Sequence, residues 1–368
     1  MTVKRTIDTP FLLVVSALVI GGLLIFTSSA LSLLAADGGV TFTSVAVSQL
    51  LFGLVFGGTA LVLFAKLDYR RLRVYTPYFF FLALGLSVLT FVPHIGLSLK
   101  GAARWIALGP FSFQPEELLK FATVLFLSAI YTARFRHVQT LRGGILPLVL
   151  VAGSACVILL LQPDTAGVAI IGMASVAILF AAGGRLSHLL LLLLIGAVAI
   201  AGAAFKYPHV ASRIQTFFNQ GADPQGAGWQ IQQSLIAVGS GELGGRGFGQ
   251  SVQKFSYLPE PIGDSIFAVA AEEFGFIGSV CLVLLYTAFA LLGLRIASRA
   301  PDPFGGLVVV GLVILIVGQS FFNIASALGL VPLVGVPLVF VSHGGSSLAI
   351  SLAEVGVILN ISKRMRHT

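Results

Sequence analysis

Charged side chains are scarce in this chain. Only 22 Lys+Arg and 14 Asp+Glu occur among 368 residues, so 10% of the residues are charged, whereas a soluble domain has about 25%. In addition, 57% of the residues are hydrophobic, which is more apolar surface than a soluble core can bury. The composition excludes an ordinary soluble domain and indicates a protein embedded in a bilayer.

Cysteine is nearly absent. Cys156 and Cys281 both lie in apolar segments, which is typical of small core residues and excludes a disulfide framework or a zinc-type spacing. The net charge of +8 is dispersed over short loops and forms no stripe. The sequence therefore predicts no nucleic-acid partner.

Long apolar segments are abundant. A helix needs roughly 20 apolar residues to cross the hydrocarbon, and backbone groups in lipid must be paired internally, so such segments are helices. The chain is expected to be an all-α polytopic membrane bundle of ten transmembrane helices, in a single domain over 1–368. The candidate spans are 11–35, 45–65, 76–93, 115–133, 144–161, 164–183, 186–204, 265–295, 304–330 and 338–362.

The basic residues fix the orientation, because cytoplasmic loops carry an excess of Lys and Arg. With both termini in the cytoplasm, only Asp8, Asp68 and Asp302 are acids on that side, and the long loop 205–264 is extracytoplasmic. The basic residues on the cytoplasmic side are then Lys4, Arg5, Lys66, Arg70, Arg71, Arg73, Arg134, Arg136, Arg142, Arg185, Arg295, Arg299, Lys363, Arg364 and Arg366.

Three outer loops, 94–114, 205–264 and 331–337, are rich enough in polar and aromatic residues to suggest work at the outer surface. The longest contains Trp229 and Gln230 and a glycine-dense stretch. The match of Gly239-Ser240-Gly241-Glu242-Leu243-Gly244 to a dinucleotide fingerprint has no meaning outside a βαβ unit. No internal repeat is visible, which disfavours an inverted-repeat transporter.

Ionisable groups at the ends of apolar spans are candidates for function. Asp264 lies where the large loop meets the eighth span; it is either a helix N-cap or a base at a pocket mouth, and one role does not exclude the other. Glu260 is either a second acid or a solvated loop charge. In the fourth span, Glu117 and Lys120 share one helix face, as a structural ion pair or as part of a polar pocket.

Basic residues of the first outer loop suit a phosphate. Arg104 binds phosphate oxygens in pairs or is only an interfacial anchor beside Trp105, and Lys100 precedes it. Asp164 is expected to cap a helix. Glu272 or Glu273 should point into the protein, Glu354 is expected to be structural, and His343 has no partner spaced for a catalytic or metal role.

The motifs together resemble the SEDS family (shape, elongation, division and sporulation), the FtsW/RodA group of peptidoglycan polymerases. The resemblance runs from the first span to Lys363. Its blocks, in order, are Lys100-Gly101 with Arg104-Trp105-Ile106, Phe113-Gln114-Pro115 with Glu117 and Lys120, Leu161-Gln162-Pro163-Asp164, Trp229-Gln230 with Ser234-Leu235-Ile236-Ala237, Gly247-Phe248-Gly249-Gln250-Ser251, Tyr257-Leu258-Pro259-Glu260, Asp264 with Phe267 and Glu272-Glu273, and Gly344-Gly345-Ser346-Ser347.

The chain departs from the family pattern at two places. Ile262-Gly263 replaces the usual His-Thr before the Asp, and His343 replaces the usual Tyr before Gly-Gly-Ser-Ser. Neither departure removes an ionisable group with an assigned role. The form Leu-Pro-Glu-Pro-Ile-Gly-Asp favours the division-type FtsW branch over RodA.

The resemblance implies an enzyme of the bacterial cytoplasmic membrane that polymerises lipid II into glycan strands, with Asp264 as the essential acid and possible use of Mg²⁺ or Mn²⁺. It also implies substrate-binding roles for Arg104, Lys100, Glu117, Lys120, Trp229, Gln230, Glu260 and Ser346. Arg246 and Lys254 are further cations for the pyrophosphate. The implied partners are lipid II, the nascent glycan strand, membrane lipid and a class B penicillin-binding protein, which is a transpeptidase.

Two other functions stay open. A lipid II flippase would place its polar groups near the midplane, between broken helices, whereas here they gather at the outer face. A scaffold that recruits a transpeptidase would need no Asp264 chemistry at all.

Overall fold

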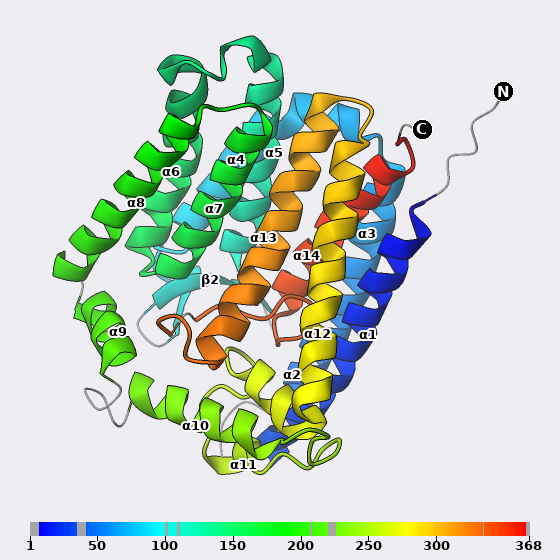
Figure 1. Ribbon diagram of the computed structural model, residues 1–368, viewed down its shortest axis with the longest axis vertical. Helices are drawn as coiled ribbons and strands as arrows, with labels where there is room; N and C mark the ends of the chain where they lie inside the picture. Colours follow the sequence, from blue (N-terminus) through cyan, green and yellow to red (C-terminus); the bar gives the residue numbers. More distant parts are fainter. Residues whose placement is uncertain are drawn as a thin grey trace.

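Apolar helices packed side by side make up most of the protein (Figure 1). The computed structural model describes residues 7–34, 42–99, 102–108, 111–206, 208–219, 226–333 and 335–365. The helical segments of the bundle are α1 (Thr9–Ala30), η1 (Leu31–Leu34), α2 (Phe42–Val47), η2 (Ser48–Phe56), α3 (Gly57–Lys66), α4 (Tyr69–Leu89), α5 (Pro115–Ala133), η3 (Phe135–His137), η4 (Leu141–Ile145), α6 (Leu146–Leu161), α7 (Thr165–Ala181), α8 (Leu186–Lys206), α12 (Ile266–Ser298), α13 (Pro303–Ala327) and α14 (Gly345–Ser362).

The predicted helical bundle is confirmed, and each predicted span overlaps a helix or a run of helices, although the bounds differ by up to seven residues, as for α4, which begins at Tyr69 and not at 76. Among the described residues, seven of these segments are long and apolar enough to cross a membrane. Of the others, α7 is apolar but shorter, and α5 carries Glu116, Glu117 and Lys120 in its first turns. The sequence predicts that the last span begins at 338. In the structure, 338–344 form turns and irregular backbone, and α14 begins at Gly345.

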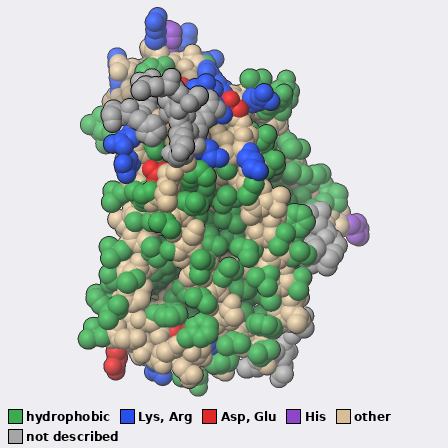
Figure 2. Space-filling model, turned by 90° about the vertical axis from the view of Figure 1, so that its right-hand side faces the viewer, with side chains coloured by type: hydrophobic (Ala, Val, Ile, Leu, Met, Phe, Trp, Pro, Cys, Tyr) green, Lys and Arg blue, Asp and Glu red, His purple; other side chains and the backbone are tan. Residues whose placement is uncertain are grey.

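The two ends of the bundle differ in charge. In Figure 2 hydrophobic side chains cover the middle of the visible face, and Lys and Arg gather at the top. This end carries the start of α1, the end of α14 and the loop between α12 and α13 (Figure 1), and is the predicted cytoplasmic end. The opposite end, called the loop end below, carries the short helices α9 (Pro208–Phe218), α10 (Ala227–Ser240) and α11 (Gln253–Ser256).

A small sheet also lies at the loop end, where the sequence predicted only a loop. Its strands β1 (Gly96–Leu99), β2 (Ala102–Leu108) and β3 (Phe111–Phe113) are antiparallel in the order β1-β2-β3. The pairing of β1 with β2 shifts between Leu97 and Ser98, so that Arg104 is the unpaired residue of a bulge. Bulges redirect side chains, and this one carries Arg104.

Small residues bring α14 close to its neighbours. A Cβ atom on Gly53 or Gly57 would lie 2.8 Å from Leu348 or from Leu352 and Ala349 of α14, and one on Gly356 would lie 2.5 Å from the Leu61 oxygen. Helices pack closely in membranes where such small residues face each other. As a result α14, with Glu354 and Asn360, is almost entirely buried.

Helix α12 is broken at Gly275, whose φ of 66° lies in the left-handed region. A break in an apolar helix leaves backbone groups that need partners. Residues 242–247 of the large loop supply them. The four bonds run from Arg246 N to Glu272 O (3.0 Å), Gly247 N to Glu273 O (3.0 Å), Phe276 N to Glu242 O (2.8 Å) and Ile277 N to Leu243 O (3.2 Å).

Candidate functional site

Arg104 joins the sheet to the link between α6 and α7. Its Nε donates to the Gln162 oxygen at 3.1 Å and its Nη2 donates to the Pro163 oxygen. Its Nη1 lies 3.4 Å from Asp164 Oδ1. Because the side chain is largely buried and bound to three acceptors, it is more than an anchor at the membrane edge.

Asp164 caps α7, as predicted. Its Oδ1 accepts from Gly167 N at 3.2 Å. Burial, followed by the nearby Glu116 carboxylate, raises the pKa of Asp164 to about 8. The cap residue is therefore also part of a cluster of charges.

The predicted pair of Glu117 and Lys120 is confirmed. Lys120 Nζ donates to Glu117 Oε1 at 2.9 Å and lies 3.6 Å from Glu116 Oε1. All three side chains are buried at the loop end of α5. Lys120 also donates to Gln319 Oε1 of α13 at 2.7 Å, so the pair forms part of an inner polar wall.

Ser346 adjoins this wall. Its Oγ accepts from Gln114 N at 3.3 Å, at the residue that precedes α5. Gln319 in turn donates to the Pro337 oxygen at 3.2 Å. The irregular segment before α14 is thereby held next to the first turn of α5.

Asp264 lies at the loop end, half-buried, just before α12. The residue at the N-cap position is Ser265, so the alternative that Asp264 itself caps the helix is wrong by one residue. Asn323 Nδ2 donates to the Asp264 main-chain oxygen at 2.9 Å. A Cβ on Gly335 would lie only 3.2 Å from Asp264 Oδ2, so a side chain at this position would press against the carboxylate.

Arg213 of α9 faces this carboxylate and was not identified from the sequence. Burial, and next the charge of Arg104, lower the pKa of Arg213, while Asp264 and Asp164 act in the opposite direction. Arg213 thus brings Asp264 into the same electrostatic field as Arg104 and Asp164. Arg213 is the one charged residue of the stretch 210–219. Nothing in the spacing of the sequence indicates that it lies near Asp264.

The turn that carries Asp264 is bound by residues 342 and 343. Ser342 Oγ donates to the Gly263 oxygen at 2.8 Å, and His343 N donates to the Ile262 oxygen at 2.8 Å. Burial lowers the pKa of His343, and the charge of the exposed Glu260 opposes this effect. Glu260 therefore lies on the same turn as Asp264, and His343 packs behind it.

Trp229 and Gln230 hold α10 against this turn. Trp229 Nε1 donates to the Tyr257 oxygen at 3.0 Å, and Gln230 Nε2 donates to Ser265 Oγ at 3.1 Å. Trp229 stays 38% exposed. Both residues support the Asp264 turn, and the ring still offers a surface at the loop end.

Glu272 and Glu273 point inward, as expected of at least one of them, and bind the large loop. Lys254 Nζ lies 2.7 Å from Glu273 Oε1, and Ser28 Oγ donates to the same carboxylate. Lys254 is 2% exposed, so the expectation that it offers a surface cation is wrong. Arg246 is 3.4 Å from Glu272 Oε1, and its charge is already partly balanced.

Lys100, which the sequence predicts to bind substrate, lies outside the described residues. Among the described residues, no group of three or more His, Cys, Asp or Glu side chains is placed to hold a metal ion.

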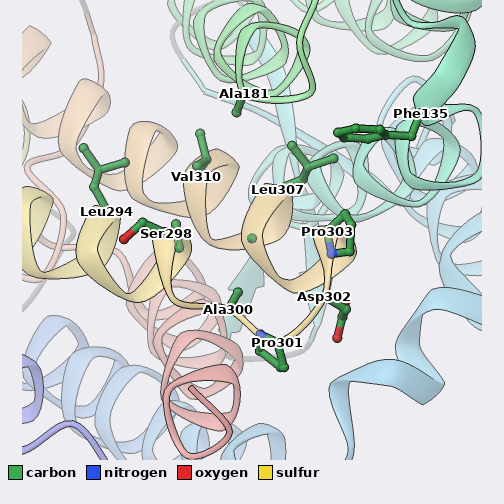
Figure 3. Close-up of a pocket in the computed structure, with 12 residues that line it drawn as sticks. Phe135, Ala181, Leu294, Ser298, Ala300, Pro301, Asp302, Pro303, Leu307 and Val310 are labelled. Carbon is green, nitrogen blue, oxygen red and sulfur yellow. The ribbon is translucent and has the colours of Figure 1, made fainter. Parts of the chain in front are cut away.

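One open pocket of the described structure is remote from these residues. It has a volume of about 470 Å³ and lies between the ends of α7, α12 and α13, with Phe135, Pro301 and Asp302 in its wall (Figure 3). This is the predicted cytoplasmic end of the bundle. The pocket contains none of the predicted site residues and is not the candidate site.

The fold and the cluster define a polytopic membrane protein with an Asp, Glu, Arg and Lys site at its loop end. Residues 8–367 match the family model described as cell cycle protein, of the FtsW, RodA and SpoVE proteins. The chain belongs to this family, which confirms the predicted family.

The curated relatives share most of their length with this chain. It is 37% identical over 370 residues to stage V sporulation protein E of Bacillus subtilis (strain 168), covering all of both chains. It is 36% identical over 362 residues to the "Probable peptidoglycan glycosyltransferase FtsW" of Trichlorobacter lovleyi, covering 98% of this chain and 94% of the relative.

Two solved structures have the same fold. One, described as "Structural coordination of polymerization and crosslinking by a peptidoglycan synthase complex", gives a TM-score of 0.80 at 27% identity and covers 98% of both chains. The other, the rod shape determining protein RodA of Thermus thermophilus, gives 0.70 at 26% identity and covers 99% of both.

Proposed function

We propose that this protein is a peptidoglycan glycosyltransferase that polymerises lipid II at the outer face of the bacterial cytoplasmic membrane. The name of the FtsW relative that matches over 94% of its length, "Probable peptidoglycan glycosyltransferase FtsW", supports the class of reaction. The observation that carries the proposal is the half-buried Asp264 carboxylate at the loop end, electrostatically coupled to Arg213 beside the Arg104–Asp164 pair.

In the proposed reaction Asp264 acts as general base. It takes the proton of the 4-hydroxyl of an acceptor GlcNAc, and that oxygen attacks the anomeric carbon of the growing strand. The bond from this carbon to the pyrophosphate breaks, and undecaprenyl pyrophosphate leaves with the electron pair. Such base assistance contributes about 10²–10⁴ in rate when the base lies within about 3 Å of the proton it abstracts.

The leaving pyrophosphate needs positive charge at the same end of the bundle. Arg213 and Arg104 supply guanidinium groups there, and guanidinium binds phosphate oxygens in pairs. Fixed cations aimed at developing negative charge lower the barrier without reorganisation. We assign Lys100 to the same role from the sequence.

The remaining site residues hold the surrounding segments in place. Glu117, Lys120 and Ser346 do so where α5 meets the start of α14, and Trp229 and Gln230 support the turn with Glu260 and Asp264. A divalent ion, if used, fits a mode in which substrate phosphates supply most ligands and the protein one or two carboxylates.

The proposed topology has ten transmembrane helices, both termini in the cytoplasm and 205–264 outside. It is supported by the gathering of Lys and Arg at one end of the bundle and by α9, α10 and α11 at the other. Our proposed partner is a class B penicillin-binding protein. The similar structure of a synthase complex that couples polymerisation and crosslinking supports it.

Purified Asp264→Asn with lipid II tests the proposal, with Glu242→Gln as matched control because Glu242 is exposed and outside the site. We expect glycan strands and released undecaprenyl pyrophosphate from wild type and control, and a rate lowered by about 10²–10⁴ in Asp264→Asn. Near wild-type polymerisation by Asp264→Asn rules out the base. Movement of lipid II between leaflets without strand formation identifies a flippase, and no activity in any variant, despite transpeptidase binding, identifies a scaffold.

A further inference from the structure

Two buried carboxyl groups meet beside the Arg104 pair. Glu116 comes from the first turn of α5 and Asp164 caps α7, and their side chains are 3% and 1% exposed. The two carboxyl groups are close enough to interact electrostatically. A Cβ on Gly167 would lie 2.2 Å from Asp164 Oδ2 and 2.8 Å from Glu116 Oε1, so both oxygens flank one point.

The other contacts of the two groups leave one oxygen without a donor. Asp164 Oδ1 accepts from Gly167 N and faces Arg104. Glu116 Oε2 accepts from Gln114 Nε2 at 3.0 Å, and Oε1 faces Lys120. Asp164 Oδ2 is buried and has no donor among the described residues. If both groups were ionised, two acceptors would face each other in a dry site.

The surrounding charges also indicate that the two groups are not both ionised. The cations facing the pair are Arg104 from β2, Lys120 from α5 and Arg213 from α9. The acids in contact with this set are Glu117, Asp264 and Glu354, besides the pair itself. With all five acids ionised the acids outnumber the cations by two, so the charges favour bound protons, and the pair is a place where two carboxyl groups can share one.

We propose that Glu116 and Asp164 hold one proton between them and act as a carboxyl pair that positions Arg104 at the reaction site. Like charges in one site cannot both be ionised cheaply, so the proton converts a repulsion into a hydrogen bond. The functional part of this inference rests on the proposed glycosyltransferase activity. The pair itself does not touch the reacting atoms.

The direction of the pH effect follows from the raised pKa of Asp164, about 8. Below this pH the pair keeps its proton, and Arg104 remains bound to the α6–α7 link. Above it the proton leaves, the two carboxylates repel and the position of Arg104 is disturbed. Polymerisation should therefore decline on the alkaline side of about pH 8.

Infrared spectroscopy of the full-length protein in lipid nanodiscs tests the pair without substrate. The wild-type spectrum minus that of Glu116→Gln should contain a protonated-carboxyl C=O band equivalent to one group per molecule, lost above about pH 8. Asp164→Asn should lose the same band. Glu242→Gln, at an exposed position, should keep it. A difference spectrum without the band, in both pair variants, overturns the shared proton.

The functional part is tested by the pH profile of polymerisation. In Glu116→Gln the amide donates to Asp164 at every pH, so the alkaline decline of the wild type should be absent. An unchanged alkaline decline in this variant overturns the positioning role even if the infrared band is present. Failure of the wild type to polymerise at any pH contradicts the proposed function. The infrared result then decides by itself whether Glu116 and Asp164 share a proton.

Discussion

Lys254 Nζ lies 2.7 Å from Glu273 Oε1, and neither side chain is more than 2% exposed. The ammonium also donates to Ser28 Oγ and to the Gly249 oxygen. One ion pair thereby connects α1, the broken helix α12 and the large loop. Its position makes it a structural element rather than a substrate contact.

Removal of one partner should be costly. Lys254→Met leaves Glu273 buried and unpaired, and breaking a buried pair costs about 3–5 kcal/mol. We expect a large fall in the thermal unfolding midpoint of the detergent-solubilised protein. Arg246→Gln is the matched control, because Arg246 is 43% exposed in its pair with Glu272, and such pairs contribute about 0–1 kcal/mol. Equal effects of the two substitutions would contradict the structural role of Lys254.

Gly275 should not tolerate a side chain. Its φ is 66°, and an added Cβ would lie 2.3 Å from Gly245 N. A non-glycine residue in the left-handed region costs about 1–3 kcal/mol, and the clash adds to this. We expect Gly275→Ala to lower the unfolding midpoint, and Gly244→Ala, which has open space around its Cβ, to change it little. A stable Gly275→Ala protein would mean that α12 is continuous.

Arg213 should affect catalysis and not folding. A hydrogen bond to a charged group contributes about 1.5–3 kcal/mol, so Arg213→Gln should lower kcat/KM for lipid II by about 10–100-fold. Arg299→Gln, at the predicted cytoplasmic end, is the control and should leave the rate unchanged. If Arg213→Gln polymerises like wild type with an unchanged unfolding midpoint, Arg213 does not act on the pyrophosphate.

The orientation can be measured by cysteine labelling. In a chain without Cys156 and Cys281, Ser256→Cys places an exposed thiol at the loop end and Ser298→Cys one at the basic end. A membrane-impermeant maleimide should label position 256 in intact cells and position 298 only after permeabilisation. The reverse pattern would invert the proposed topology.

Local spacing predicted several of these features correctly. The apolar runs gave the helices, the separation of Glu117 and Lys120 along one helix gave their pairing, and the position of Asp164 before an apolar run gave its cap. Each of these features depends on residues that are neighbours along one helix or turn.

The rest of the site depends on contacts between distant segments. Arg104 reaches Asp164 only because a bulge in an unpredicted sheet turns its side chain. Arg213 approaches Asp264 through the position of α9, which no spacing encodes. The sequence predicts Lys254 as a surface cation because its spacing does not reveal its pairing with Glu273. Glu273 belongs to α12, and a single glycine does not predict the break in that helix.

The break at Gly275 also limits how this protein can be re-engineered. Residues 242–247 complete the hydrogen bonding of α12. Deleting them would leave amide and carbonyl groups of the break without hydrogen-bond partners in the lipid, which costs several kcal/mol of stability per group. Chimaeras with a relative should therefore transplant that stretch and 272–277 as a single cassette. Exchange of either piece alone is expected to yield protein that fails to accumulate in the membrane.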